Sequence, residues 1–273
     1  MTTSMMTSTC RASCADVRQV RGVQRATLDD GVEAWFTGSD LAGVQDANLA
    51  HHRPHAPERL AAARDAVGAA TRTDPATWHL MRQVHGAQAA TITADVAPGA
   101  ELRDVDIIVT DLLDRPLVVL AADCLPILAA GHLAIAAAHA GWRGIVADVP
   151  GALVAALTSL GEDVADLRVV IGPAIGPCCY EVGEEVREAV GRVASKARST
   201  TRSGTPSIDL RAAARTRLAA LGVMIVEDAG ASGGPASACT SCGSGWFSHR
   251  RDPMSGRQAG IIVRRSDAGP EGG

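Results

Sequence analysis

Two histidines and one cysteine have the side-chain chemistry and the setting of metal ligands. His85 ends a run that predicts a strand, Cys124 lies among apolar residues, and His139 closes a very apolar run. A buried histidine without a partner is costly, so His139 is the strongest single candidate. Together they predict a zinc site with three protein ligands and one open position, as in catalytic zinc sites. Their spacing matches no short zinc-finger pattern, so only the fold can bring them together.

The other six cysteines do not lead us to expect a second metal site. The seven cysteines are Cys10, Cys14, Cys124, Cys178, Cys179, Cys239 and Cys242. An odd number in a long chain indicates reduced thiols in a cytosol. A second zinc site made by Cys178 and Cys179 with Cys239 and Cys242 is an alternative, but adjacent cysteines are expected to present their thiolates poorly to one tetrahedral ion. We expect loop cysteines with neither a ligand nor a redox role.

The composition limits the classes of partner. The chain has 273 residues, with 26 Lys and Arg against 30 Asp and Glu, so its net charge is −4. Without a basic field, and with only 3% aromatic residues, a nucleic-acid partner is not expected. The apolar stretch 116–140 is broken by Asp123, Pro126 and Gly131, which predicts buried strands and no membrane association. No signal-peptide core is visible near the start, so we expect a cytoplasmic protein.

Short apolar runs and Ala-rich helical patterns must position these side chains. Strands are predicted over 32–37, 79–84, 90–93, 106–110, 116–121, 133–138, 167–171, 223–226, 245–248 and 260–263. Helices are predicted over 58–67, over 145–160 with an interruption at Pro150, and over 182–193 and 210–221. This mixture predicts an α+β fold. Residues 1–26 and 266–273 are typical of disordered tails, and 195–207 of a surface loop.

Five motifs in order carry a resemblance to a known family. They are Gln83-Val84-His85-Gly86, Ala122-Asp123-Cys124-Leu125-Pro126-Ile127, His139-Ala140-Gly141-Trp142-Arg143-Gly144, Ile171-Gly172-Pro173-Ala174-Ile175-Gly176 with Cys179-Tyr180-Glu181-Val182, and Cys239-Thr240 before Ser248-His249-Arg250-Arg251-Asp252. With Phe36-Thr37 and Asn48-Leu49, they resemble the YfiH-like proteins, also called the laccase-domain or multicopper-polyphenol-oxidase-like family. That family includes bacterial purine nucleoside phosphorylases and the peptidoglycan editing factor. The chain departs from the family pattern at Gly38-Ser39-Asp40.

The resemblance implies a single catalytic domain over residues 27–265, built as an α/β/β/α layered sandwich with mixed sheets. It implies zinc at His85, Cys124 and His139. It also implies phosphorolysis of adenosine, inosine, guanosine and methylthioadenosine, together with deamination of adenosine. The expected partners are therefore a purine nucleoside and phosphate, bound by a monomer or a homodimer. Copper oxidation needs several copper ions held by many histidines, and the chain has only eight, so zinc is preferred.

The required chemistry assigns roles to further residues. Asp123, beside Cys124, is the expected acid for the departing group. Arg143 is expected to hold phosphate, with Arg250 as the second choice. The resemblance further implies substrate contacts from Asn48, Gln83 and Arg250.

Three other functions remain open at this stage. They are a hydrolase that edits peptidoglycan precursors, a copper-dependent polyphenol oxidase and a non-catalytic binding module stabilised by zinc. The hydrolase would use the same zinc centre, because both reactions need one open zinc position. Metal analysis and product analysis with adenosine and phosphate separate these functions.

Overall fold

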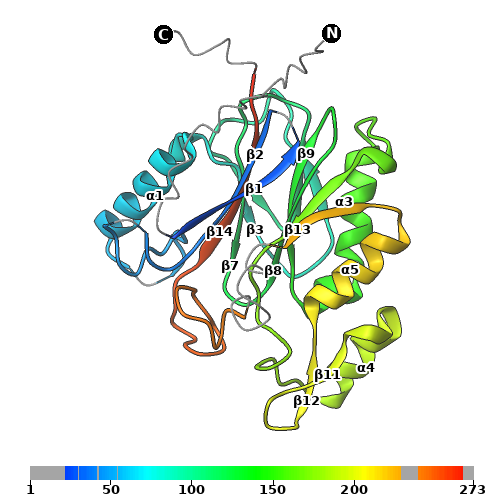
Figure 1. Cartoon of the computed structure of the whole chain (residues 1–273). Helices are drawn as coiled ribbons and strands as arrows, with labels where there is room; N and C mark the ends of the chain where they lie inside the picture. The colour runs from blue at the N-terminus through cyan, green and yellow to red at the C-terminus, as the bar shows by residue number, and fades with distance from the viewer. Residues whose placement is uncertain (1–21, 30, 42, 54, 229–238, 267–273) are drawn as a thin grey trace, which may run out of the picture.

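The computed structural model describes residues 22–29, 31–41, 43–53, 55–228 and 239–266 (Figure 1). Its strands are β1 (Val23–Asp29), β2 (Val32–Thr37), β3 (Leu80–Arg82), β4 (Ala89–Thr91), β5 (Glu101–Arg103), β6 (Ile107–Thr110), β7 (Leu117–Ala121), β8 (Leu125–Ala130), β9 (Ile135–Ala140), β10 (Arg168–Ile171), β11 (Arg198–Thr200), β12 (Pro206–Ile208), β13 (Met224–Asp228) and β14 (Gln258–Arg264). Its α-helices are α1 (Pro57–Thr71), α2 (Trp142–Val146), α3 (Val149–Thr158), α4 (Glu184–Val193) and α5 (Leu210–Ala220).

The strands form two main sheets. The four-stranded sheet has the order β1-β2-β14-β7 and is antiparallel throughout. The six-stranded sheet has the order β13-β10-β8-β9-β6-β4 and is mixed, because β13 is parallel to β10 and β4 is parallel to β6. Strands β7 and β8 are consecutive in the chain but belong to different sheets, so the segment between them crosses from one sheet to the other.

Three apolar cores separate the layers. Successive side chains of a strand point to opposite faces, and in β2 Trp35 packs with α1 while Phe36 packs between the two sheets. The outer face of the six-stranded sheet packs against α3 and α5 through residues such as Leu153 and Leu218. Figure 1 shows α1 on one side of the sheets and α3 and α5 on the other. The predicted α/β/β/α sandwich is therefore confirmed.

Two helices replace the single interrupted helix that the sequence predicts over 145–160. The Asp148 side chain accepts a hydrogen bond from the backbone amide of Gly151, which makes Asp148 the N-cap of α3. Pro150 lies in the first turn, where its missing amide hydrogen is tolerated. The proline therefore helps to start α3 and does not interrupt a helix.

Some predicted boundaries differ from the structure. The expected domain start at residue 27 falls inside β1, which pairs with β2 from Val23 onward. The predicted loop 195–207 contains most of the antiparallel pair β11–β12. The predicted strand 245–248 is wrong, because these residues form bends and irregular backbone. The Arg251 guanidinium donates a hydrogen bond to the carbonyl of Trp246 in this segment. The expected tails lie largely outside the described residues. Within those residues, no helix is both long and apolar enough to cross a bilayer.

Glu33 in β2 joins the start of the four-stranded sheet to its C-terminal strand and to α1. Its carboxylate lies 2.7 Å from Arg265 Nε and 2.6 Å from a terminal nitrogen of Arg72. Burial opposes the charge of Glu33, but the hydrogen bonds from Arg265 and Arg72 outweigh it, so the pKa of Glu33 is below its ordinary value. A carboxyl with a lowered pKa stabilises the fold above its unfolded-state pKa and loses that contribution as the pH falls through its folded-state pKa.

We expect Glu33→Gln to lower the free energy of unfolding by about 2 kcal/mol at pH 7, because two charge-assisted hydrogen bonds are weakened. The difference from the unsubstituted protein should shrink as the pH falls below 4, since protonated Glu33 has no charge to lose. Urea denaturation between about pH 3 and pH 7 measures both effects. Glu188→Gln, at an exposed position of α4, is the control and should change stability little. A pH-independent loss in Glu33→Gln would contradict the ion-pair explanation.

Candidate functional site

The three predicted metal ligands lie together at one end of the β8–β9 pair. Cys124 Sγ is 3.8 Å from His85 Nε2. The imidazole rings of His85 and His139 meet edge to face, with their centroids 4.9 Å apart. One ligand atom from each residue lies within 4.8 Å of the other two. The structure thus brings together the donor atoms that the sequence singles out.

Strand pairing explains why Cys124 and His139 are neighbours. Strands β8 and β9 are antiparallel, with Leu125 opposite Ala140 and Pro126 opposite His139. Cys124, which precedes β8, therefore lies beside the end of β9. His85 comes from the loop after β3 and has a positive φ of 63°, which is uncommon for a residue with a side chain.

Asp106 holds this loop and orients His139. The fully buried carboxylate of Asp106 accepts hydrogen bonds from the backbone amides of Val84, His85 and Gly86, at 3.2, 3.0 and 2.7 Å. It also lies 2.8 Å from His139 Nδ1. The second ring nitrogen, Nε2, is left for the thiolate or for an ion. A carboxylate behind a histidine in this way fixes the ring and raises its basicity as a metal ligand.

Charge coupling prepares Cys124 for metal binding. Burial alone would raise the pKa of the Cys124 thiol, but the positive charge of His139 and hydrogen bonds from both histidines lower it to about 6. Burial would likewise lower the pKa of His139, but the Cys124 thiolate and Asp106 raise it to about 9. In the metal-free protein, each of the two groups therefore favours the charged form of the other.

Gly141 leaves the space in which the ligands meet. A Cβ atom at position 141 would lie 3.0 Å from His85 Cδ2 and 3.1 Å from Cys124 Sγ. Both contacts are tighter than ordinary van der Waals packing, and both atoms belong to the candidate centre. Any other residue at 141 would press on the two ligands.

The donor set fits a zinc ion. Two imidazole nitrogens and one thiolate are preferred zinc ligands, and three of them leave a fourth position open. Ligand atoms around a tetrahedral zinc lie roughly 3.5 Å apart, close to the 3.8 Å between Cys124 Sγ and His85 Nε2. Asp106 supplies the carboxylate behind a ligand that such sites commonly have.

The centre faces a hollow of about 380 Å³. This volume falls within the range of small-molecule sites, roughly 300–1,000 Å³. The hollow has several basic or imidazole side chains in its wall, namely His51, His52, Arg82, His249 and Arg257. Burial and the neighbouring Arg53 lower the pKa of Arg257, so an anion beside Arg257 would stabilise its charge.

The residues expected to contact substrate lie in different places. Gln83 lines the hollow, and its amide group exchanges two hydrogen bonds with the backbone of Leu120 in β7. Arg143 is not among the lining residues; its guanidinium stacks on the Trp142 ring, 4.5 Å from the centroid. Arg250 donates a hydrogen bond to the carbonyl of Glu181. Of these three, only Gln83 lies in the wall of the hollow.

Asn48 holds backbone in the structure. Its side chain accepts hydrogen bonds from the amides of Ala50 and Arg257, at 3.0 and 2.9 Å. It lines a smaller neighbouring hollow of about 130 Å³ and not the one that contains Cys124. Asn48 thus holds the backbone at Ala50 and at Arg257, and Arg257 forms part of the wall of the hollow that contains Cys124.

Both carboxylate oxygens of Asp123 are engaged. Thr240 Oγ1 donates to one and the Arg250 amide donates to the other, each at 2.6 Å. Asp123 also has a positive φ of 85°, in the segment that crosses between the sheets. These two hydrogen bonds tie the crossing segment to the C-terminal loop. The role of Asp123 as an acid stays a prediction.

Sequence reasoning gave no role to Asp106, and it chose Arg143 and Arg250 for phosphate ahead of Arg257. Asp106 sits between Val105 and Ile107 at the start of an apolar strand, and an acid in such a place needs a buried partner. The sequence therefore indicates that Asp106 has a buried partner, either a histidine or an arginine. Arg257 gives no comparable signal, because its position depends on how the loop before β14 folds against Asn48.

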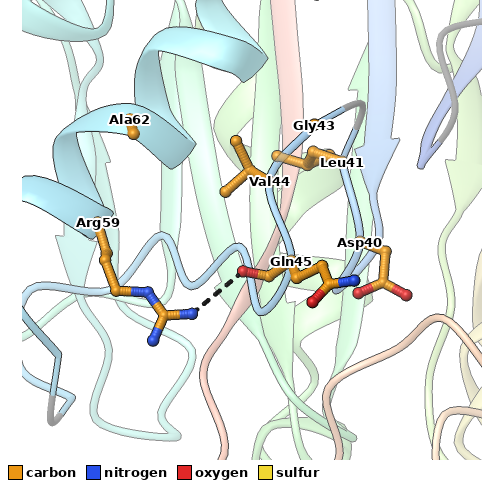
Figure 2. A pocket seen from close by; sticks show the side chains of 7 residues that line it. All are labelled: Asp40, Leu41, Gly43, Val44, Gln45, Arg59 and Ala62. Atoms are coloured by element: carbon orange, nitrogen blue, oxygen red, sulfur yellow. Dashed lines mark hydrogen bonds between the residues drawn. The ribbon is translucent and has the colours of Figure 1, made fainter.

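A second hollow lies between α1 and the loop that follows β2. Figure 2 shows its lining, which includes Asp40, Val44, Gln45 and Arg59. Arg59 donates a hydrogen bond to the carbonyl of Gln45 at 3.4 Å. The described residues that line this hollow include no histidine or cysteine.

Comparison with known proteins places the chain among related sequences. The family model described as multi-copper polyphenol oxidoreductase laccase matches residues 36–265. A purine nucleoside phosphorylase of Streptomyces coelicolor is 37% identical over 245 residues, which cover 88% of this chain and 98% of that protein. A purine nucleoside phosphorylase of Streptomyces griseus is 37% identical over 227 residues, covering 82% of this chain and 89% of that protein.

Solved structures share the fold. The crystal structure of the hypothetical protein YfiH of Bacillus licheniformis has a TM-score of 0.75 at 28% identity, covering 86% of this chain and 93% of that one. The structure of YlmD from Geobacillus stearothermophilus has a TM-score of 0.73 at 29% identity, covering 87% of this chain and 93% of that one.

We expect Asp106→Asn to weaken zinc binding roughly 10- to 100-fold, because the residue behind His139 loses its charge and one of its two acceptor oxygens. Competition with a chromophoric chelator measures the affinity. Asp104→Asn is the matched control, because Asp104 is an exposed neighbour whose carboxylate pairs with Arg82. Equal zinc affinity in all three proteins would show that Asp106 does not support His139 as a ligand.

Proposed function

Because this chain belongs to the multi-copper polyphenol oxidoreductase laccase family, and relatives of similar length are purine nucleoside phosphorylases, we propose that it is a zinc-dependent purine nucleoside phosphorylase. The proposed substrates are adenosine, inosine, guanosine and methylthioadenosine, with deamination of adenosine as a second activity. The observation that carries the proposal is the three-donor centre at a hollow whose wall is rich in cationic and imidazole groups.

The donor set supports zinc and argues against a multi-copper oxidase. Multi-copper chemistry needs several ions, each held largely by histidines. Within the described part of the chain, two groups of residues can hold an ion; one has two histidines and the other has none. A zinc ion at His85, Cys124 and His139 would act as a Lewis acid and lower the pKa of a bound water, which is the chemistry that deamination requires.

Phosphorolysis requires, in addition, that the site bind phosphate. A phosphate oxygen must form a bond to the ribose C1′ carbon while the bond from C1′ to the purine nitrogen breaks. The protein must therefore hold a dianion beside the sugar. Arg257 is the leading candidate for this role, because it lines the hollow and because burial and Arg53 lower its pKa, which a bound anion would reverse. Arg143 would have to leave its stacking position on Trp142 to reach the hollow.

Gln83 and Asp123 support the reaction by holding backbone segments beside the candidate centre in place. Gln83 keeps its loop against β7 through its two hydrogen bonds with Leu120, so the wall beside His85 stays in place. The crossing segment is fixed at Asp123 by Thr240 and the amide of Arg250. We propose that Gln83 contacts the nucleoside and that Asp123 sets the orientation of Cys124. Asp123 serves as an acid only if it gains a proton in the complex.

Cys124→Ser should lose one zinc ion per chain and lower adenosine phosphorolysis and adenosine deamination by more than about 100-fold, because a hydroxyl is a far poorer zinc ligand than a thiolate. Elemental analysis and chromatography of hypoxanthine, adenine and inosine measure the two effects. Protein stripped of metal by a chelator is the control and should show the same loss of both activities, which zinc alone should reverse. A Cys124→Ser variant with full metal content and turnover would end the proposal.

Arg257→Ala should raise the KM for phosphate about 10- to 100-fold and leave the deamination of adenosine nearly unchanged, because only phosphorolysis uses phosphate. Arg257→Lys keeps the charge and should restore part of the loss. Arg143→Ala is measured beside it, since the sequence prediction gives Arg143 the phosphate-binding role. A phosphate-specific defect in Arg143→Ala alone would transfer the role to Arg143, and an equal loss of both activities in Arg257→Ala would make that residue structural.

A further inference from the structure

Four cysteines outside the candidate centre converge on one point. Cys178 and Cys179 lie in the turn after β10, and Cys239 and Cys242 lie in the loop before β14. All four are free thiols, and their sulfur atoms lie within 4.8 Å of one another. The two pairs are about sixty residues apart in the chain, so tertiary structure brings them together.

Local backbone geometry makes this convergence possible. The expectation that Cys178 and Cys179 cannot present their sulfurs to one point is wrong. Adjacent side chains diverge in a strand, but these two residues lie in a turn, where the amides of Cys179 and Tyr180 both donate to the carbonyl of Gly176. In the turn, both thiols face the second pair.

In the second pair, the sulfur of Cys239 accepts a hydrogen bond from a backbone amide of the first loop. The amide of Gly176 donates to Cys239 Sγ at 3.2 Å, and Cys239 is fully buried. The amide of Gly243 donates to the Cys239 carbonyl, which closes a tight turn over the pair. A Cβ atom at position 176 would lie 3.1 Å from Cys239 Cβ and 3.2 Å from Cys178 Sγ. Glycine at 176 is thus required for the two loops to meet.

The spacing of the sulfurs matches a tetrahedral thiolate site. Four thiolates at 2.3 Å from a zinc ion are separated by about 3.8 Å. Cys178 Sγ and Cys242 Sγ are 3.8 Å apart. Arg202 lies 3.3 Å from Cys242 Sγ and offers a positive charge to a site whose four thiolates exceed the charge of one divalent ion.

We propose that Cys178, Cys179, Cys239 and Cys242 bind a second metal ion, a structural zinc that joins the turn after β10 to the loop before β14. Four thiolates leave no open position, so this ion has no catalytic role. This inference does not rest on the proposed function.

The four-cysteine site is connected to the candidate centre through hydrogen bonds of Thr240. Thr240 lies between the two cysteines of the second pair, and its hydroxyl binds Asp123, next to Cys124. The amide of Thr240 also donates to the carbonyl of Ala174, in the segment that leads to Cys178. The structural zinc thus holds the loop that fixes the crossing segment between β7 and β8.

Metal content tests the proposal directly. The unsubstituted protein, purified with its native metal, should contain two zinc ions per chain, and Cys242→Ala should contain one. Cys242→Ala should also lower the Tm by about 5 °C or more, because the ion's binding energy contributes to folding. Ser241→Ala, in the same loop, is the control and should keep both ions. One ion per chain in all three proteins would overturn the proposal.

Cobalt substitution supplies a test that needs no change in the cysteine cluster. In Cys124→Ser the candidate centre is disabled, so cobalt(II) added to the apoprotein should give the intense sulfur-to-metal absorption of a tetrathiolate site at one ion per chain. No such absorption, or a disulfide between Cys178 and Cys242 found by mass spectrometry in protein prepared without oxygen, would overturn the proposal. A loss of the catalytic metal alone would affect only the proposed function.

Discussion

Asp106 carries a negative charge at a position with no exposure to water, and the geometry of the candidate centre depends on how that charge is satisfied. An isolated buried carboxylate is strongly unfavourable, so its partners must stay in place. Those partners are three consecutive amides of the loop that carries His85, and the ring of His139. One side chain therefore fixes two of the three ligands relative to each other, although they come from segments more than fifty residues apart.

The third ligand depends on the two-sheet architecture. Cys124 lies in the segment that leaves β7 in one sheet and enters β8 in the other, where neither sheet dictates its backbone. Hydrogen bonds from Thr240 and Arg250 to Asp123 replace the missing sheet contacts. The positive φ of Asp123 is kept by these contacts, and it turns the chain so that the next residue faces His85.

Side-chain chemistry identified the three candidate ligands better than it predicted their surroundings. His85, Cys124 and His139 could be recognised because histidine and cysteine in apolar runs need a reason to be there. The long apolar strands were also recognisable, since burial on both faces leaves continuous hydrophobic runs, as in β8. The layer order came from the resemblance to a family. Strand β1 was missed because its polar residues, such as Gln24 and Arg25, hide the pattern. The four-cysteine site was considered and rejected, because its geometry depends on two turns that meet only in the folded chain.

The position of β14 has a consequence for how the protein is made. Residues 258–264 pair with β2 on one side and with β7 on the other, so they fill the middle of the four-stranded sheet. During synthesis, the edges of β2 and β7 that pair with β14 stay unpaired until almost the whole described chain has left the ribosome. Sequence-distant pairing of this kind is slow and exposes strand edges to other chains. Those edges are therefore open to pairing with other chains until β14 has been synthesised.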